Sequence, residues 1–164
     1  MPGMDQILAD TEAATGSKLP EWVMDAHCAL GVIAALDGDV EEVAVHYEAI
    51  SYIGVMFKSY ADENTERLRG VMTTAMRRFD DAEAHFELAL SQCKAGGYRV
   101  EEARTLVAHS DMLLERSAME TEDGDNDYRR RAIKLQDEAL TLTQEMGMRP
   151  LTERILARRE ILRA

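Results

Sequence analysis

The sequence predicts an all-α fold, and two observations carry the prediction. The composition is rich in Ala, Leu, Glu and Met, which favour helices, whereas aromatic residues make up only 5% and proline occurs 3 times. Apolar residues recur at intervals of three and four along nearly the whole chain, as they do on one face of a helix. A stretch of the chain also recurs after 39 residues, which is typical of stacked helical hairpins.

Glycine, aspartate and proline divide this pattern into successive helices. The predicted helices span, in order, residues 4–15, 21–36, 40–57, 62–78, 80–94, 99–116, 128–146 and 151–162. Gly38 is expected to end one helix, because glycine readily adopts the left-handed conformation, and Asp39 can cap the next. Gly97 and Gly147 are expected to end later helices. Residues 118–127 are polar and acidic, and we expect them to form a solvated loop.

The repeat is visible when residues 38–50 are placed over residues 77–89. The order His, aromatic residue, Glu coincides in the two copies, and in the preceding helices Gly31 falls on Gly70. A glycine in the first helix of each pair allows the second helix to approach closely. The alignment therefore predicts helical hairpins with equivalent crossings.

Large rings in the second helix of each hairpin are the other shared feature. Tyr47 and Phe86 are expected to fill the space under the next unit, and a fainter third copy surrounds Ala132. One hairpin cannot bury both of its faces, so such units stack. The sequence therefore predicts a right-handed α-α superhelix of about three hairpins with an N-terminal and a C-terminal capping helix.

These elements are expected to form a single domain over residues 1–164, since the length suits one domain. Its predicted parts are an N-terminal helix (1–20), three hairpins (21–57, 62–95 and 99–146, with loop 118–127 in the third) and a capping helix (151–163).

The pattern of small and aromatic residues resembles the tetratricopeptide repeat. The matching residues are Gly31, Gly38, Val43, Tyr47 and Ile50 in the first unit and Gly70, Ala82, Phe86 and Ala89 in the second. The early Trp and the terminal Pro of that repeat are absent, and the shift exceeds its period of roughly 34 residues. Helices or loops longer than those of the consensus repeat are therefore implied.

Residues 65–164 also resemble the C-terminal repeat arrays of large bacterial signalling ATPases, among them LuxR-type transcription regulators and ATPase-coupled nucleotide cyclases. The similarity lies in Asp80–Leu90, Cys93–Arg99, Asp111–Arg116 and Glu145–Arg154. In those proteins the array is a sensor or scaffold, and the ATPase, cyclase or DNA-binding modules lie elsewhere. The resemblance implies such a role here and transfers no catalytic residue.

Charge and composition argue against several classes of function. The net charge of −12 disfavours direct nucleic-acid binding, which needs a basic face. The resemblance implies a bacterial chain. We expect it to be cytoplasmic and not to enter a membrane, because the longest apolar stretch is far shorter than the roughly 20 residues of a membrane span. Cys28 and Cys93 are expected to be free thiols, and no motif indicates an enzyme, a cofactor or a metal site.

If the chain binds a partner, the first helix of each hairpin should line the binding groove. The residues that we expect to face inward include Asn64, Arg67, Arg104 and Asp111. Two guanidinium groups in a groove can hold a carboxylate of a peptide. The alternative is that Arg67 and Arg104 are solvated and pair with nearby glutamates.

The expected function is a non-enzymatic one, in which the domain binds a protein or peptide partner. Two alternatives stay open at this point. A small ligand could bind between the helices and shift their packing. Alternatively, the acidic first half and the basic last helix could drive homo-oligomerisation, because their charges are opposite.

Overall fold

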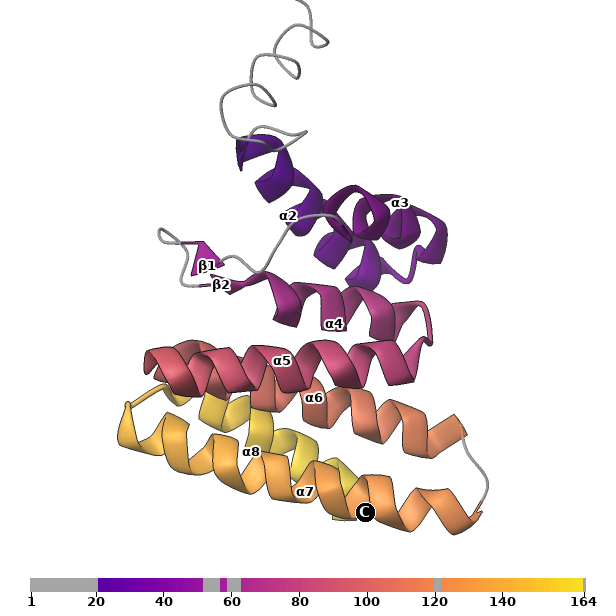
Figure 1. The fold of residues 1–164 in the computed structure, drawn as a ribbon. Coiled ribbons are helices and arrows are strands. Elements are labelled where there is room, and N and C mark those ends of the chain that lie inside the picture. Colours follow the sequence, from indigo (N-terminus) through magenta and orange to yellow (C-terminus); the bar gives the residue numbers. More distant parts are fainter. Residues whose placement is uncertain (1–20, 52–56, 59–62, 120–121, 164) are drawn as a thin grey trace, which may run out of the picture.

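The computed structural model describes residues 21–51, 57–58, 63–119 and 122–163, and every structural statement below concerns these residues. The fold is all-α, as predicted, with one short pair of strands (Figure 1). The helices are α2 (Glu21–Asp37), α3 (Val40–Ser51), α4 (Thr65–Ala75), α5 (Phe79–Gly96), α6 (Arg99–Met119), α7 (Glu122–Glu145) and α8 (Arg149–Arg163). Strands β1 (Phe57–Lys58) and β2 (Glu63–Asn64) pair in antiparallel fashion ahead of α4.

Helices that follow one another along the chain pack against each other. The closest pairs are α2 with α3, α4 with α5, and α6 with α7. The pairs are joined because α4 contacts α2, and α6 contacts both α4 and α5. The helices therefore form a stack that has α2 and α3 at one end and α7 and α8 at the other (Figure 1).

The turns inside the first two pairs are equivalent and lie 39 residues apart. Gly38 has φ 77°, and Arg77, at the same place in the second pair, has φ 58°. In each turn a backbone N–H reaches five residues back: Asp39 N donates to Ala34 O at 3.0 Å, and Arg78 N donates to Thr73 O at 2.9 Å. The turn geometry therefore repeats even where glycine is replaced by arginine.

α4 and α5 approach closely at Gly70, as the sequence predicts. A Cβ atom at Gly70 would lie 2.6 Å from the fully buried ring of Phe86. Gly31 faces the Cβ atom of His46 and the end of Met72 instead. Tyr47 is only half-buried in the structure. The two aromatic positions are therefore not equivalent in their packing.

Tyr47 belongs to a polar network that joins α3, α4 and α5. Its hydroxyl donates to His85 Nε2 at 3.0 Å, and His85 Nδ1 donates to Glu66 Oε2 at 2.6 Å. Arg69 donates to the other oxygen of Glu66 at 2.5 Å and also to the backbone carbonyl of Ile50. The ring of Tyr47 packs at the edge of the apolar core formed by α2, α3 and α4, and its hydroxyl serves this network.

The predicted helix boundaries are wrong at two places along the chain. The helix expected over residues 40–57 does not reach Phe57, which lies in β1, and the helix expected over residues 62–78 begins only at Thr65, because the unpredicted strand pair includes Glu63 and Asn64. The loop expected over residues 118–127 is mostly helical, because α6 continues to Met119 and α7 begins at Glu122. Acidic residues are favoured in the first turn of a helix, which accounts for the second difference. The predicted N-terminal helix, residues 4–15, lies outside the described residues.

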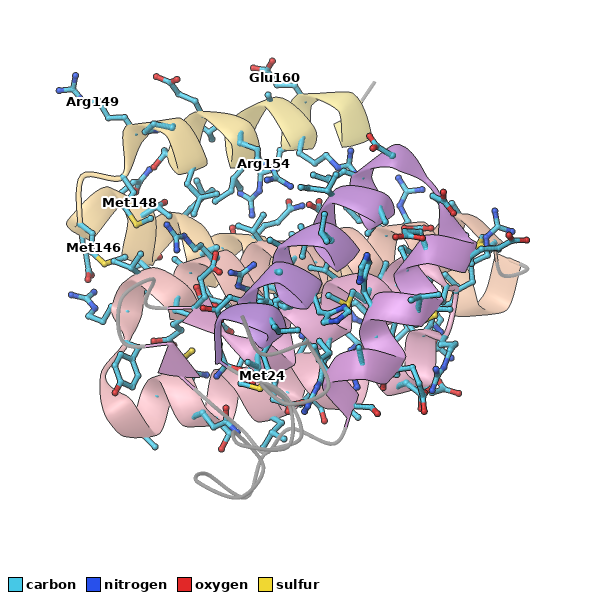
Figure 2. All side chains as sticks on the ribbon, turned by 90° about the horizontal axis from the view of Figure 1, so that it is seen from above. Met24, Met146, Met148, Arg149, Arg154 and Glu160 are labelled. Carbon is cyan, nitrogen blue, oxygen red and sulfur yellow. The ribbon has the colours of Figure 1, made fainter. Side chains whose placement is uncertain are left out.

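The last helix, α8, packs on α7 through the buried side chain of Ile155. Figure 2 shows Arg149 and Glu160 pointing away from the body of the chain, whereas Arg154 points toward it. Along the described segments, we find no helix with the length and apolar character needed to cross a membrane.

Candidate functional site: an arginine-lined groove

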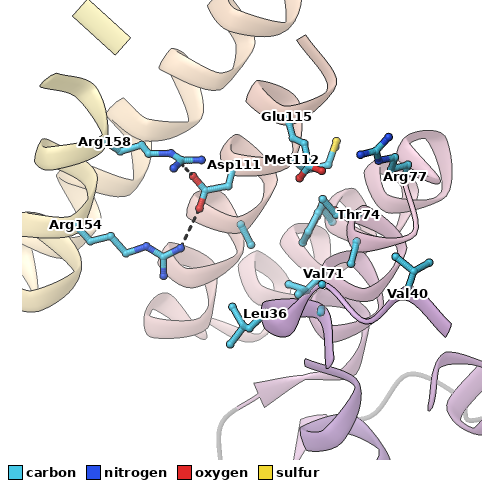
Figure 3. A pocket seen from close by; sticks show the side chains of 15 residues that line it. Leu36, Val40, Val71, Thr74, Arg77, Asp111, Met112, Glu115, Arg154 and Arg158 are labelled. Carbon is cyan, nitrogen blue, oxygen red and sulfur yellow. Dashed lines mark hydrogen bonds and ion pairs between the residues drawn. The ribbon is translucent and has the colours of Figure 1, made fainter. Parts of the chain in front are cut away.

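Two adjoining cavities run along one side of the helix stack. Their volumes are about 700 and 440 Å³, and their linings share Leu36, Val71, Ala108 and Arg154. These residues come from α2, α4, α6 and α8, the first helix of each successive pair and the final helix. We call the two cavities together the inner groove; Figure 3 shows the smaller one from close by.

The helical period explains which side chains face the inner groove. On α4 the lining residues are Arg67, Val71 and Thr74, and on α6 they include Arg104, Val107 and Asp111. Each set follows the spacing i, i+3 or i+4, i+7 that places residues on one face of a helix. Apolar side chains therefore form the floor of the groove, and charged ones lie at its sides.

Asn64 does not line the groove, which corrects the prediction. It is fully buried, and its side-chain oxygen accepts a hydrogen bond from Glu66 N at 2.8 Å as the N-cap of α4. Its side-chain nitrogen donates to Gln92 Oε1 at 2.7 Å. Both ends of the amide are engaged within the chain, so Asn64 stabilises the start of α4.

Arg67 lines the groove but is held by a buried carboxylate. Its Nε donates to Glu101 Oε1 at 2.5 Å, and its Nη2 lies 3.5 Å from Glu63 Oε1. The side chain of Arg67 is only 13% exposed, and that of Glu101 is fully buried. The pairing with glutamates expected as the alternative is therefore present, but Arg67 is not a solvated surface residue.

Arg104 is the freer of the two predicted arginines. Its side chain is 42% exposed, and its Nη1 lies 3.7 Å from Glu101 Oε2. That separation exceeds a hydrogen bond, and the Oε2 atom has no hydrogen-bond partner in the structure. Arg104 can therefore turn toward a ligand without breaking a hydrogen bond to Glu101.

Asp111 lies across the groove from α8. Its carboxylate accepts from Arg154 at 3.0 Å and lies 3.4 Å from Nε of Arg158 (Figure 3). Both arginines are more than half exposed, so these ion pairs are weak and can exchange with a ligand. Asp111 therefore orients two arginines at the edge of the groove.

Sequence reasoning missed Arg154, which lines both cavities. The sequence predicts residues 151–163 only as a capping helix, and this prediction places none of its side chains in the groove. The signal lies in the spacing of Arg154 and Arg158, four residues apart on one face of a basic helix. Arg77 was missed as well, because its position was assigned to the end of a helix.

The charge of the groove differs in sign from that of the whole chain. Five arginines line it, at positions 67, 77, 104, 154 and 158, against the carboxylates of Glu63, Asp111 and Glu115. The buried Glu101 beneath them offsets one further positive charge. An excess of positive charge remains in a protein whose net charge is −12, so the groove favours an anionic group.

Among the described residues there is no group of three His, Cys, Asp or Glu side chains that could hold a metal ion. Comparison with known proteins gives no further assignment: no protein-family model and no curated protein matches the chain.

Proposed function

We propose that the chain is a tetratricopeptide-like repeat domain that binds a partner protein in its inner groove and catalyses no reaction. In this proposal α2–α3, α4–α5 and α6–α7 are three hairpins of a right-handed superhelix, and α8 is the capping helix. The single observation that carries the proposal is the lining of the groove, to which the first helix of every pair and α8 all contribute. Such concave surfaces are what repeat proteins use for binding.

The equivalent turns and the contacts between successive first helices support the proposed superhelix. Gly38 and Arg77 end the first helices of two units with the same backbone geometry. The contacts of α2 with α4, and of α4 with α6, place successive first helices side by side. A curved array of this kind presents a continuous surface rather than an enclosed pocket, and an extended segment or a helix of a partner fits such a surface.

The occupant that fits best is a segment with acidic and apolar side chains. Apolar side chains would pack on the floor formed by Val71, Val107 and Ala108. A carboxylate would lie between Arg104 and Arg154, which line the same cavity from α6 and α8. Arg67 is a positioning residue in this scheme, because Glu101 holds it in place.

The resemblance to the repeat arrays of signalling ATPases suggests the setting. Within a bacterial signalling or transcription-regulatory system, the domain would serve as the effector-sensing or scaffold part. The inner groove is the surface on which another protein of that system would bind.

The test is a selection of random peptides on the full chain, with binding of the selected peptides measured by titration calorimetry. We expect peptides enriched in Asp or Glu next to Leu, Ile or Val. The variant Arg104→Ala/Arg154→Ala should bind them about tenfold or more weakly. Arg129→Ala/Arg130→Ala, which removes two exposed arginines of α7 outside the groove lining, is the matched control and should bind normally. Peptides without acidic residues, or equal affinities of both variants, would contradict the proposal.

The volume of the larger cavity favours one second candidate, a small-ligand sensor. About 700 Å³ is within the range of pockets that hold a metabolite-sized molecule. A screen of anionic metabolites by thermal shift separates the two functions, because a ligand that binds only the folded chain raises its melting temperature. A specific rise that is lost in Val107→Trp, which narrows the cavity, would favour the sensor.

Homo-oligomerisation through opposite charges finds less support. Arg154 and Arg158 of the basic last helix are paired with Asp111, and Arg159 donates to Asp137 at 2.5 Å. Self-association through these arginines would have to displace the intrachain ion pairs, whereas Arg149 points away from the body of the chain (Figure 2). Sedimentation at low and high salt tests the remaining possibility, because salt screens such attraction.

A further inference from the structure

The outer face of α2 is a second surface, on which apolar side chains are exposed. Ala26, Ala29, Leu30 and Ile33 are all exposed there, with Leu30 and Ile33 about half exposed. The opposite face of the same helix is buried through Met24 and Cys28. We call the four exposed residues the α2 outer face. None of them lines the inner groove.

This face is unusual because α2 is apolar on nearly all sides. From Ala26 to Leu36 the helix carries no charged residue, and its only polar side chain is that of His27. A helix that is apolar all round is normally buried on all sides. The described part of the chain covers only one side of α2, at the end of the stack (Figure 1).

The segment that carries the α2 outer face has charged side chains of one sign only. The segment from Glu21 to Ser51, which forms α2 and α3, has seven acidic residues and no Lys or Arg. Six of the acidic side chains are described; Asp25 is half-buried and the others are exposed. An apolar face on an acidic segment attracts a partner segment that carries positive charge.

Charge also decides between the possible occupants. A second copy placed face to face would bring two such acidic segments together, and their like charges would repel. The chain's own residues 1–20 carry three acidic residues and one Lys, so they have the same sign of charge. A basic amphipathic helix avoids both conflicts.

We propose that the α2 outer face docks a basic amphipathic helix of a partner protein. Its apolar stripe lies on Leu30 and Ile33, and its Lys or Arg side chains face the carboxylates of α2 and α3. This surface lies at the end of the stack and acts independently of the inner groove. The domain thus has two binding surfaces that prefer opposite charges.

The experiment uses the full chain and a labelled synthetic amphipathic helix of Leu and Lys, with the same helix built from Leu and Glu as its control. Binding is followed by fluorescence anisotropy. The Lys peptide should bind, and Leu30→Ser/Ile33→Ser should weaken its affinity about tenfold. Two controls should bind normally: Leu88→Ser/Leu156→Ser, which changes two equally exposed leucines elsewhere, and the groove variant Arg104→Ala/Arg154→Ala.

A photo-crosslinking residue in place of Ala29 identifies the occupant directly. A crosslink to the Lys peptide supports the proposal. Crosslinking to a second copy, or to residues 1–20 of the same chain, in place of the peptide would overturn it. Unchanged affinity of Leu30→Ser/Ile33→Ser would overturn it as well, since binding would then depend on charge alone.

Discussion

Arg67 and Glu101 join α4 to α6 through a pair of side chains that are 13% and 0% exposed. Arg67 Nε donates to Glu101 Oε1 at 2.5 Å, and the same oxygen accepts from the backbone N–H of Asn64 at 2.8 Å. The short strand pair and the start of α4 are thereby fixed to the first turn of α6. This link shapes the wall of the inner groove.

Removing one partner of this pair should destabilise the fold. Glu101→Ala leaves Arg67 without its buried counter-charge, and Arg67→Ala leaves the buried carboxylate of Glu101 without the guanidinium that pairs with it. Each change should lower the free energy of unfolding by about 3–5 kcal/mol. Arg104→Ala is the matched control on the same carboxylate. Because Arg104 is more exposed and lies farther away, its loss should cost under about 1 kcal/mol. Urea denaturation measures all three, and equal costs would contradict the separation of roles.

The helices and their order could be predicted from the sequence because apolar periodicity and turn residues are local signals. Gly38, Gly97 and Gly147 all have positive φ, where the sequence placed helix ends. The strand pair β1–β2 could not be predicted, since two residues on each side carry no periodicity. The extension of α7 back to Glu122 was missed because a run of acidic residues was interpreted as a loop rather than as the favourable first turn of a helix.

Gly70→Ala should be more destabilising than Gly31→Ala. A Cβ at Gly70 would stand 2.6 Å from the ring of Phe86, which is fully buried and cannot move away. We expect a loss of about 1–3 kcal/mol, despite the better helix propensity of alanine. At Gly31 the nearest atoms belong to the flexible end of Met72, so the loss should be smaller.

Thermal denaturation of the two variants checks this order. The double variant Gly70→Ala/Phe86→Leu should be less destabilised than the sum of its single changes, because a smaller side chain relieves the clash. Additive losses would show that Gly70 and Phe86 do not meet at the crossing of α4 and α5.

The buried imidazole of His109 should make stability depend on pH. Burial lowers the pKa of His109 to about 4, and the nearby charge of Glu83 opposes this only in part. The folded chain then holds neutral His109, so between the ordinary pKa of 6.5 and about 4 the unfolded chain binds more protons. The free energy of unfolding should therefore fall as the pH drops through this window, by about 3 kcal/mol at most.

Urea denaturation at pH 7, 5.5 and 4.5 measures this dependence. His109→Phe keeps the stacking on Phe86, whose ring centroid lies 5.4 Å from that of His109, and removes the ionisable group. The variant should lose most of the decline between pH 6.5 and 4.5. Below that range Glu66 adds a further loss. Burial raises the pKa of Glu66, but the hydrogen bond from His85 and the charge of Arg69 outweigh it and lower the pKa. An unchanged decline in His109→Phe would exclude His109 as its source.

The thiol groups should be inert in the folded chain. Cys28 and Cys93 are buried, and burial together with the charge of Glu101 raises the pKa of Cys93 to about 11. Because the thiolate is the reactive form, labelling by a thiol reagent at pH 8 should be slow until the chain is unfolded in urea. Rapid labelling of Cys93 under native conditions would show that α5 opens readily from α6.

The site was less predictable from the sequence than the fold. Arg67, Arg104 and Asp111 could be placed on inward faces from helical periodicity alone, and all three line the groove. The pairing of these arginines with glutamates is the alternative that the sequence predicts, but the particular pairs could not be predicted, because Glu101 lies 34 residues beyond Arg67 and Arg154 lies 43 beyond Asp111. Asn64 was misplaced because an N-cap is set by the first residue of the helix, which moved when the strand pair replaced the expected helix start.

The affinity of a selected acidic peptide for the full chain and for Arg104→Ala/Arg154→Ala tests the central claim most directly. Titration calorimetry should show an affinity about tenfold or more weaker for the variant, with no change in its melting temperature. Equal dissociation constants would contradict the claim that these two arginines hold the carboxylate of a partner in the inner groove.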